Sequence, residues 1–450
     1  MDVVIRNGTI ISASDTYSAD LAIRDGKLIM IGQKLNIEAA RVFDATGRFV
    51  LPGAIDAHVH LQMPVGKLVS ADDCESGTKA AACGGVTTIL DFATPDPGQP
   101  LDSAITERIA LFKPAAQIDY GLHAVIRDTG DGLAGQMKKS MELGVTSFKV
   151  YMVYAGLMVD DSGLARILAL ARDLGALTCV HAEDPALLEN RTRALLAAGQ
   201  TSPWHHYDSR PELVEAEAIN RIIGLAKATK SSLYIVHLAC REGLAAVTGA
   251  RAEGYPVYAE TCPQYLHFTH EVYKHSDGQR YVCSPAFKGQ DSQDALWQGI
   301  ARGEIDTVAT DHCPFQSAEK DAGRDDFTRI PNGCMGVETL YPFMLSAANC
   351  GRISYNKAVE VCSTNVARLF GCAPQKGTIA IGSDADLVIY DPRGESVVSR
   401  ARMHSKVDYT IWEGLRLAGR LDQVFSRGRL VYSDGIFTGE PGWGSFVRCR

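Results

Sequence analysis

Six side chains that can bind metal ions each follow a short apolar run in this 450-residue sequence. They are His58, His60, Lys149, His181, His237 and Asp311. Each run is rich in β-branched residues, which predicts a strand, and most runs are separated by segments long enough for a helix. In a closed parallel barrel all strands end at one mouth, so the six side chains would reach a common metal cluster. This pattern predicts a metal-dependent hydrolase.

His58 and His60 lie two residues apart on a predicted strand, so both imidazoles leave the same face and could bind one divalent ion. A His-x-His pair alone is a weak signal, because unrelated polar residues often end a strand. Lys149 strengthens it by interrupting the apolar run Phe148–Val153, where an unpaired ammonium would be costly to bury. Beside a dication a neutral lysine can take up carbon dioxide, and the resulting carbamate could bridge two metals.

His181 and His237 could each supply a nitrogen to a second metal. The Asp311 carboxylate could bind a metal and also accept a proton from a bridging water. A hydrogen-bonded core histidine and a helix N-cap aspartate are the ordinary interpretations of such residues. The matched placement of all six favours the metal centre.

A strand-then-helix rhythm runs from Phe49 to about Phe370 and predicts a (β/α)₈ TIM barrel. A doubly wound open sheet is the competing fold, but no glycine-rich fingerprint follows the first strand. The predicted strands are Val50–His60, Thr87–Ala93, Ile118–Ile126, Phe148–Val153, Leu177–Glu183, Leu233–Ala239, Val257–Cys262 and Thr307–Asp311.

Both ends of the chain predict short strands instead. The first fifty residues have turns at Asn7-Gly8 and Asp25-Gly26, and strands are again predicted at Gly377–Ile381, Leu387–Tyr390, Val424–Arg427 and Leu430–Tyr432. Neither set can bury its own face, so we expect one small β-sandwich built from residues 1–50 and 375–450. Residues 51–374 would then form the inserted catalytic barrel.

Composition excludes several classes of protein. The net charge of −8 provides no basic footprint, so we expect no nucleic-acid partner. No apolar run approaches membrane-spanning length, and the first residues do not resemble a signal peptide. Twelve dispersed cysteines without a Cys-x-x-Cys pair indicate reduced thiols in a cytoplasmic enzyme.

Several motifs carry a resemblance that runs nearly end to end. The chain resembles the cyclic amidohydrolases of the amidohydrolase superfamily, and within them the hydantoinase/dihydropyrimidinase group. The matching segments are Pro52–His60, Gly84–Thr88, Thr146–Lys149, His181–Glu183, Glu260–Leu266, Thr310–Cys313, Ile330–Gly333 and Gly382–Val388.

The resemblance implies two Zn²⁺ ions bridged by a hydroxide and by Lys149 carboxylated to N6-carboxylysine. Other divalent metals are possible. In this arrangement His58, His60 and Asp311 hold the more buried ion, whereas His181 and His237 hold the outer one.

The resemblance also implies how a ring substrate is bound and opened. Tyr154, five residues after the lysine, would grip the ring and stabilise the oxyanion, and groups at Ser284 and Asn332 would hold the ring partly through backbone atoms. Hydroxide attack with Asp311 as proton shuttle would open a 5-substituted hydantoin or dihydropyrimidine to an N-carbamoyl amino acid. Gln62 stands where dihydroorotases carry an arginine, which argues against an acidic ring.

Other expectations from the resemblance are less specific. Met63, Val65, Tyr151 and Met158 align with an apolar gate that sorts ring substituents, although loop packing would explain them equally well. Allantoinase is the alternative activity, and a non-catalytic dihydropyrimidinase-like scaffold is disfavoured because all six ligand positions are intact. We expect a homotetramer in which Trp443–Arg450 reaches a neighbouring subunit.

Overall fold

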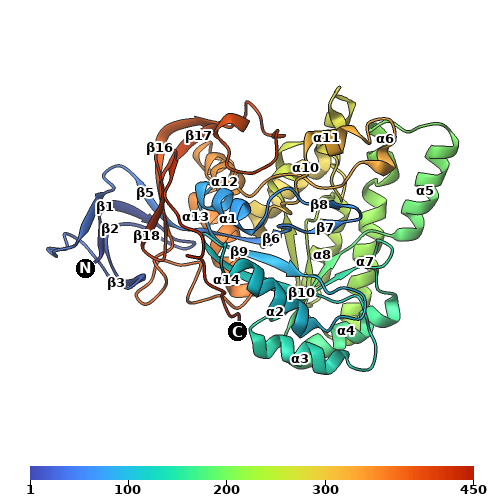
Figure 1. The fold of residues 1–450 in the computed structure, drawn as a ribbon, viewed down its shortest axis with the longest axis horizontal. Coiled ribbons are helices and arrows are strands. Elements are labelled where there is room, and N and C mark those ends of the chain that lie inside the picture. The colour runs from blue at the N-terminus through green and yellow to red at the C-terminus, as the bar shows by residue number, and fades with distance from the viewer.

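A computed structural model describes residues 1–450 as two bodies, a helix-covered parallel barrel and a mixed sheet made from both ends of the chain (Figure 1). None of its helices combines the length and the apolar character that crossing a bilayer requires. The predicted TIM barrel with a small β-domain from both termini is confirmed.

The barrel contains eight strands that pair in parallel in the order β15-β14-β13-β12-β11-β10-β9-β6. The ring is closed where His60 N donates to His312 O at 2.8 Å and His312 N donates to His58 O at 3.3 Å. The strands are β6 (Ala54–Val59), β9 (Val86–Ala93), β10 (Asp119–Val125), β11 (Ser147–Tyr151), β12 (Leu177–His181), β13 (Leu233–Ile235), β14 (Val257–Thr261) and β15 (Thr307–Val308).

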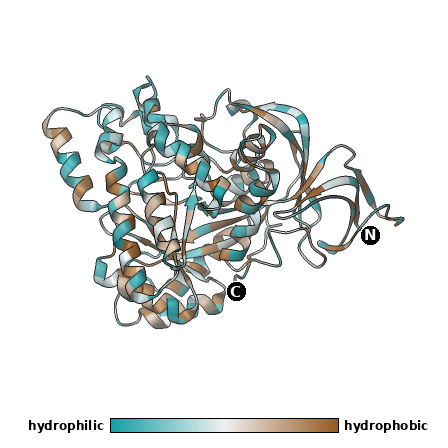
Figure 2. Ribbon diagram, turned by 180° about the vertical axis from the view of Figure 1, so that it is seen from behind, coloured by the Kyte–Doolittle hydropathy of each residue, from teal (hydrophilic) through white to brown (hydrophobic).

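Helices cover the outside of the barrel, and brown apolar and teal polar residues are mixed along them (Figure 2). In α4 (Asp161–Leu174), the N-cap Asp160 accepts a hydrogen bond from Gly163 N at 2.8 Å, and Gly175 ends the helix with a left-handed φ of 67°. The other α-helices are α1 (Cys74–Cys83), α2 (Leu101–Phe112), α3 (Leu133–Leu143), α5 (Pro185–Ala197), α6 (Trp204–Ser209), α7 (Glu212–Thr229), α8 (Arg241–Ala252), α9 (Pro263–His267), α10 (Gln290–Arg302), α11 (Ser317–Asp321), α12 (Leu340–Asn349), α13 (Tyr355–Val359) and α14 (Asn365–Leu369).

Five shorter helical turns complete the helical structure. They are η1 (His270–Lys274), η2 (Gly278–Tyr281), η3 (Phe327–Arg329), η5 (Arg400–Arg402) and the π-helical turn η4 (Glu360–Thr364).

The terminal sheet has nine strands, and β5 from the N-terminal part pairs antiparallel with β16 from the C-terminal part, with Val50 opposite Ile389. Apolar side chains from distant strands of this sheet, such as Leu21 and Phe425, share one buried cluster, so the sheet bends over its own core. Its strands are β1 (Val3–Ile11), β2 (Thr16–Arg24), β3 (Lys27–Gly32), β4 (Arg41–Asp44), β5 (Phe49–Pro52), β16 (Leu387–Val397), β17 (Arg416–Ser426), β18 (Arg429–Ser433) and β19 (Ile436–Phe437). A separate hairpin joins β7 (Pro64–Val65) to β8 (Leu68–Val69).

Three sequence predictions need correction. Asn7-Gly8 is a bulge inside the single strand β1, stabilised by Asn7 N donating to Asp20 Oδ1 at 2.8 Å, and is not a turn. The predicted strand Gly377–Ile381 is irregular. The predicted strand Val50–His60 is split at Gly53, where a side chain would lie 2.2 Å from Thr87 Oγ1, so β5 joins the terminal sheet and β6 the barrel. Division of the domains at residues 50 and 374 stays a prediction.

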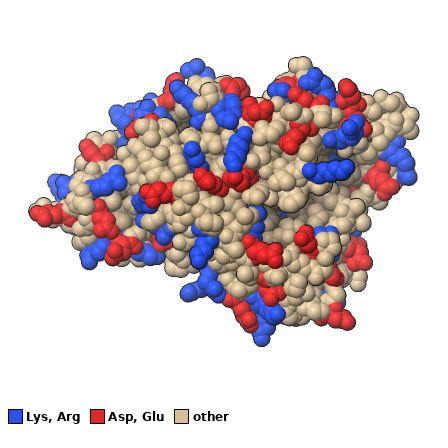
Figure 3. All heavy atoms as spheres, in the orientation of Figure 1, with Lys and Arg blue, Asp and Glu red and all other residues tan.

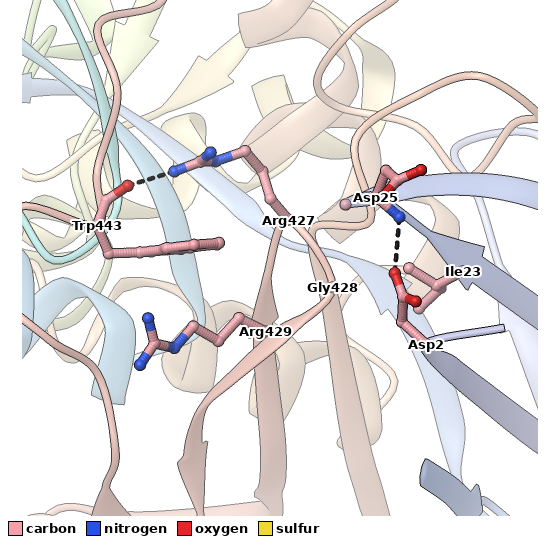
Figure 4. Close-up of a pocket in the computed structure, with 8 residues that line it drawn as sticks. Asp2, Ile23, Asp25, Arg427, Gly428, Arg429 and Trp443 are labelled. Atoms are coloured by element: carbon pink, nitrogen blue, oxygen red, sulfur yellow. Dashed lines mark hydrogen bonds between the residues drawn. The ribbon is translucent and has the colours of Figure 1, made fainter. Parts of the chain in front are cut away.

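The C-terminal segment lies against its own barrel, and the expectation that Trp443–Arg450 reaches a neighbouring subunit stays a prediction. Tyr120 N on β10 donates to Ser445 O at 3.1 Å, and Val447 N donates to Tyr120 O at 2.7 Å. The segment thereby satisfies backbone groups of β10 that no strand pairs. Figure 4 shows Trp443 between Arg427 and Arg429, with Arg427 donating to the Trp443 carbonyl.

A buried lysine joins the terminal sheet to the barrel. Lys376 Nζ lies 2.7 Å from Asp386 and 2.9 Å from Asp384, and it also contacts Asp119 on β10. These three carboxylates raise the pKa of Lys376 despite its burial, so the lysine acts as their shared cation. On the molecular surface, by contrast, basic and acidic side chains are interspersed on the face shown in Figure 3.

Candidate active site

The predicted metal ligands converge at the barrel mouth. Asp311 Oδ1 lies 3.3 Å from His58 Nε2 and 3.1 Å from His60 Nε2. The His58 and His237 rings are 5.3 Å apart between centroids, and the His181 and His237 rings are 4.5 Å apart. Four strand ends and the segment after β15 therefore direct their polar groups into one small volume.

Several of these groups are buried without any hydrogen-bond partner. They are His58 Nε2, His60 Nδ1, Lys149 Nζ and His237 Nδ1. Leaving such atoms unpaired is costly, and their shared position indicates that another species completes their bonding. Imidazole nitrogens and a carboxylate are the donors that Zn²⁺ favours, so the residues fit a divalent metal centre.

Lys149 is completely buried. Its Nζ lies 5.4 Å from the centre of the Phe92 ring and 5.0 Å from that of Tyr151. Burial lowers the pKa of Lys149 to about 8, although nearby Asp311 opposes that shift. About a tenth of the amine is therefore neutral at pH 7, far more than for an ordinary lysine, and the neutral form is the one that reacts with carbon dioxide.

The imidazoles around Lys149 are held in their neutral form. Burial is the main cause that lowers the pKa of His58, His181 and His237, and the positive charge of Lys149 lowers all three further. A neutral imidazole has the free lone pair that a metal requires. Lys149 shares ring neighbours with two of them, because Phe92 lies 4.9 Å from the His58 ring and Tyr151 lies 5.7 Å from the His181 ring.

Two carboxylates that the sequence analysis did not single out as functional orient these histidines. Glu260 on β14 accepts from His58 Nδ1 at 2.7 Å and from Tyr234 OH at 2.8 Å. Glu183 lies 2.9 Å from His181 Nε2 and accepts a hydrogen bond from Arg210 at 2.6 Å. Each contact engages one ring nitrogen and leaves the other available to a metal.

Asp56 connects the first and last strands beneath the site. Its carboxylate accepts hydrogen bonds from His58 N at 3.1 Å and from Thr310 N at 3.0 Å. Burial raises the pKa of Asp56 to about 6 in spite of these bonds. Asp56 thus fixes His58 relative to Asp311, which follows Thr310.

Three site residues other than glycine have left-handed backbone angles. The φ angles are 79° at Tyr154, 38° at His237 and 52° at Asp311. Such angles are unfavourable for most side chains and concentrate where function requires a particular orientation. The barrel framework holds these residues in position against that cost.

One predicted substrate-binding residue, Tyr154, lies beside the predicted metal ligand His181. The Tyr154 ring is 5.1 Å from the His181 ring, and burial raises the pKa of Tyr154 to about 12. Ser284 Oγ and Asn332 Oδ1 are buried without hydrogen-bond partners. Gly333 N donates to Val282 O at 3.0 Å, which brings the two segments together.

Two of the four predicted gate residues, Met63 and Met158, border different hollows. Met63 borders a hollow of about 220 Å³ with His60 and Phe92. Met158 borders a different hollow of about 700 Å³, while Tyr151 pairs with Met158 through a β-bridge. Val65 lies on the short hairpin strand β7. Their function as a gate stays a prediction.

Comparison with known proteins identifies the family of this chain. Residues 49–431 match the model of the amidohydrolase family. The chain belongs to that family. It is 42% identical to a D-hydantoinase of Geobacillus stearothermophilus, in an alignment covering 100% of this chain and 96% of the relative. It is 41% identical to a D-phenylhydantoinase of Escherichia coli O7:K1 (strain IAI39 / ExPEC), with 100% and 98% covered.

Solved structures also show similarity to hydantoinases and dihydropyrimidinases. A dihydropyrimidinase from Brevibacillus agri NCHU1002 superposes with a TM-score of 0.98 at 42% identity, covering 100% of this chain and 99% of that one. A D-hydantoinase structure superposes equally well at 41% identity, again covering 100% and 99%. The resemblance to the hydantoinase/dihydropyrimidinase group is confirmed, and the chain is a hydrolase of the cyclic-amide type.

Proposed function

We propose that this enzyme opens the ring of 5-substituted hydantoins or dihydropyrimidines at a C–N amide bond and yields N-carbamoyl amino acids. The observation that carries the proposal is the buried, unpartnered Lys149 amine among the neutral imidazoles of His58, His181 and His237. Relatives named for hydantoin and dihydropyrimidine substrates, similar over the full length, support this ring class.

We further propose two Zn²⁺ ions, the inner one held by His58, His60 and Asp311 and the outer one by His181 and His237. Ligand atoms of the inner set lie within 4.8 Å of one another. Carbon dioxide would add to the neutral Lys149 amine with loss of a proton, and the resulting carbamate oxygens would be shared between the ions. When bound, the ions would supply a hydrolytic nucleophile at neutral pH and polarise the ring carbonyl.

The protein's own groups would move the protons. The Asp311 carboxylate would take a proton from the attacking water and deliver it to the leaving ring nitrogen. Its position beside His58 and His60 supports this assignment. Tyr154 is protonated at neutral pH, as tyrosines ordinarily are, and burial raises its pKa further. Its hydroxyl would donate to the carbonyl oxygen as negative charge develops.

Ser284 and Asn332 would position the ring. Their unpartnered side-chain oxygens and the adjacent backbone could pair with the donors and acceptors of a cyclic diamide. Met63, Val65, Tyr151 and Met158 would contact the substituent. A cytoplasmic location and a homotetramer complete the proposal, and the twelve free cysteines support a reducing compartment. Light scattering of the purified protein tests the assembly.

One assay tests the activity. Metal-loaded enzyme supplied with bicarbonate would be offered dihydrouracil, both enantiomers of a 5-aryl and a 5-alkyl hydantoin, and allantoin, with product identified by mass. We expect N-carbamoyl products from the hydantoins or dihydrouracil, together with two bound metal ions per chain. Turnover of allantoin alone would establish the alternative activity. A pure, folded protein without metal or turnover would establish the scaffold.

A further inference from the structure

A second cluster of metal-binding side chains lies outside the active site, where three distant segments meet. Cys83 ends α1, Glu338 precedes α12, and His404 follows η5. The cysteine sulfur, one carboxylate oxygen and one imidazole nitrogen all lie within 4.8 Å of one another. None of the three residues belongs to the proposed active centre.

The cluster is preorganised by contacts that hold its members in place. Glu338 accepts from His404 N at 2.8 Å through one oxygen and lies 2.7 Å from His404 Nδ1 through the other. These contacts fix the imidazole ring of His404 through Nδ1, so its other nitrogen, Nε2, stays available to bind an ion. Next to Cys83, a side chain at Gly84 would approach Glu338 O to 2.5 Å, so the helix end and the Glu338 backbone are in close contact.

The three side chains are also shielded from water. Cys83 is 6% exposed, and the side chains of Glu338 and His404 are 12% and 19% exposed. A thiolate, an imidazole and a carboxylate together suit Zn²⁺ and the chemically similar Cd²⁺, and a water molecule could complete a tetrahedral set. The partial exposure of His404 provides a route for an ion from solvent.

We propose that Cys83, Glu338 and His404 form a third metal site in each chain, selective for thiophilic divalent ions. Binding replaces the thiol proton with the ion, and the proton passes to solvent. The bound ion cross-links α1 of the barrel to the loop before α12 and to the segment that leads into β17. The site stabilises this junction and takes no part in ring opening.

Titration with Cd²⁺ tests the site, because a thiolate bound to Cd²⁺ gives an ultraviolet charge-transfer band that histidine and carboxylate ligands do not produce. The zinc-loaded full-length protein would be used, and Cd²⁺ would displace any Zn²⁺ at this site because the softer ion binds a thiolate more tightly. The proposed active-centre ligands include no sulfur, so the band does not arise from that centre, and the test holds whether or not the proposed activity is correct. We expect saturation at one equivalent in the native protein and loss of the band in Cys83→Ser.

Matched variants separate this site from adventitious binding. Cys74→Ser, at the other end of the same buried helix, and Cys350→Ser, which removes the exposed thiol, should both retain the band. His404→Gln should weaken Cd²⁺ binding by about tenfold or more, and it serves as the test if Cys83→Ser does not fold. No band in the native protein, a band that survives in Cys83→Ser, or one lost with Cys350→Ser would overturn the proposal.

Discussion

Lys149 has an unusual environment for a lysine, since it is fully buried on β11 without a hydrogen-bond partner. If its carbamate supplies shared metal ligands, Lys149→Ala should lose bound metal and more than about a hundredfold of activity, exceeding the usual effect of removing an outer-shell group. Added acetate or propionate should restore part of both, because a small carboxylate can occupy the vacated space.

Lys320 provides a matched control for Lys149. It is also fully buried, but its Nζ donates to Val282 O at 2.6 Å. Metal content and turnover would be measured with and without carboxylate. Lys320→Ala should keep its metal and show no rescue, and a Lys149→Ala enzyme that keeps both ions would contradict the bridging assignment.

At the residue scale, the sequence was sufficient to predict the groups that converge at the barrel mouth. Lys149 and Asp311 were conspicuous because a charged residue interrupts or ends an apolar strand. Glu260 carries a similar signal on β14, but its partner His58 is about two hundred residues away, so only the closed barrel reveals the contact. Arg210 follows no strand, and nothing in its local sequence indicated its ion pair with Glu183.

At the scale of elements, the loop after β15 requires glycine at position 333. Its φ is 148°, and an added side chain would lie 2.2 Å from Cys313 O. Gly333→Ala should displace the neighbouring Asn332, raise KM more than it lowers kcat, and cost about 1–3 kcal/mol of folding stability.

Steady-state kinetics and thermal unfolding would measure both effects of Gly333→Ala. Gly224→Ala is the control, because Gly224 lies within α7 with no atom close to an added side chain. That substitution should leave KM unchanged and stabilise the protein by up to about 1 kcal/mol. Equal KM values in the two variants would show that Asn332 does not position the ring.

Glu215 makes the contact between α7 and the segment after β13 dependent on pH. It accepts from Ala239 N at 2.7 Å, and burial raises its pKa from 4.5 to about 7 despite Lys288 at 3.7 Å. The folded protein therefore retains the proton that the unfolded chain releases above pH 4.5. The contribution of Glu215 to the free energy of unfolding, of order 3 kcal/mol, is fully present below pH 4.5 and is lost as the pH rises through about 7.

Glu215→Gln should remove this pH dependence while it keeps an acceptor for Ala239 N. The free energy of unfolding would be measured between pH 4.5 and 8 for both proteins. We expect the free energy of unfolding of the native protein, relative to that of the variant, to fall from pH 4.5 to about 7 and to level off above pH 7. Parallel curves would mean that Glu215 titrates normally.

The strand predictions failed where local pattern and three-dimensional pairing differ. Val50–His60 was predicted as one strand, but Gly53 lets the chain pass from one sheet to another. Asn7-Gly8 has the composition of a hairpin turn, yet strand β2 continues past it, so the extra residue forms a bulge. In both cases the partner strand decides the structure, and a single sequence does not identify that partner.

At the scale of the whole molecule, Lys376 fixes the terminal sheet to the barrel through three buried carboxylates. Lys376→Met would remove the cation they share and leave Asp386 without one, whereas Lys27 still contacts Asp384 and Arg427 still contacts Asp119. We expect a loss of about 3–5 kcal/mol. The loss should persist in concentrated salt, because buried charges are screened much less than exposed ones.

The surface pair Arg416–Glu395 provides the comparison for Lys376. Its side chains are 77% and 74% exposed, so Arg416→Ala should change stability by less than about 1 kcal/mol. Unfolding by urea, followed at low and high salt, would measure both variants. A Lys376→Met protein as stable as Arg416→Ala would show that the carboxylates do not depend on the lysine.

The pairing of β5 with β16 limits how far this enzyme can be shortened. A protein shortened to the barrel would lack β1 and β16, the two strands that pair with β5. The chain that leads into β6 would then have unpaired backbone groups. Such a truncated catalyst would be expected to aggregate, since unpaired strand edges recruit other chains. A smaller version of the enzyme must therefore keep both ends of the chain, even though neither end supplies an active-site group.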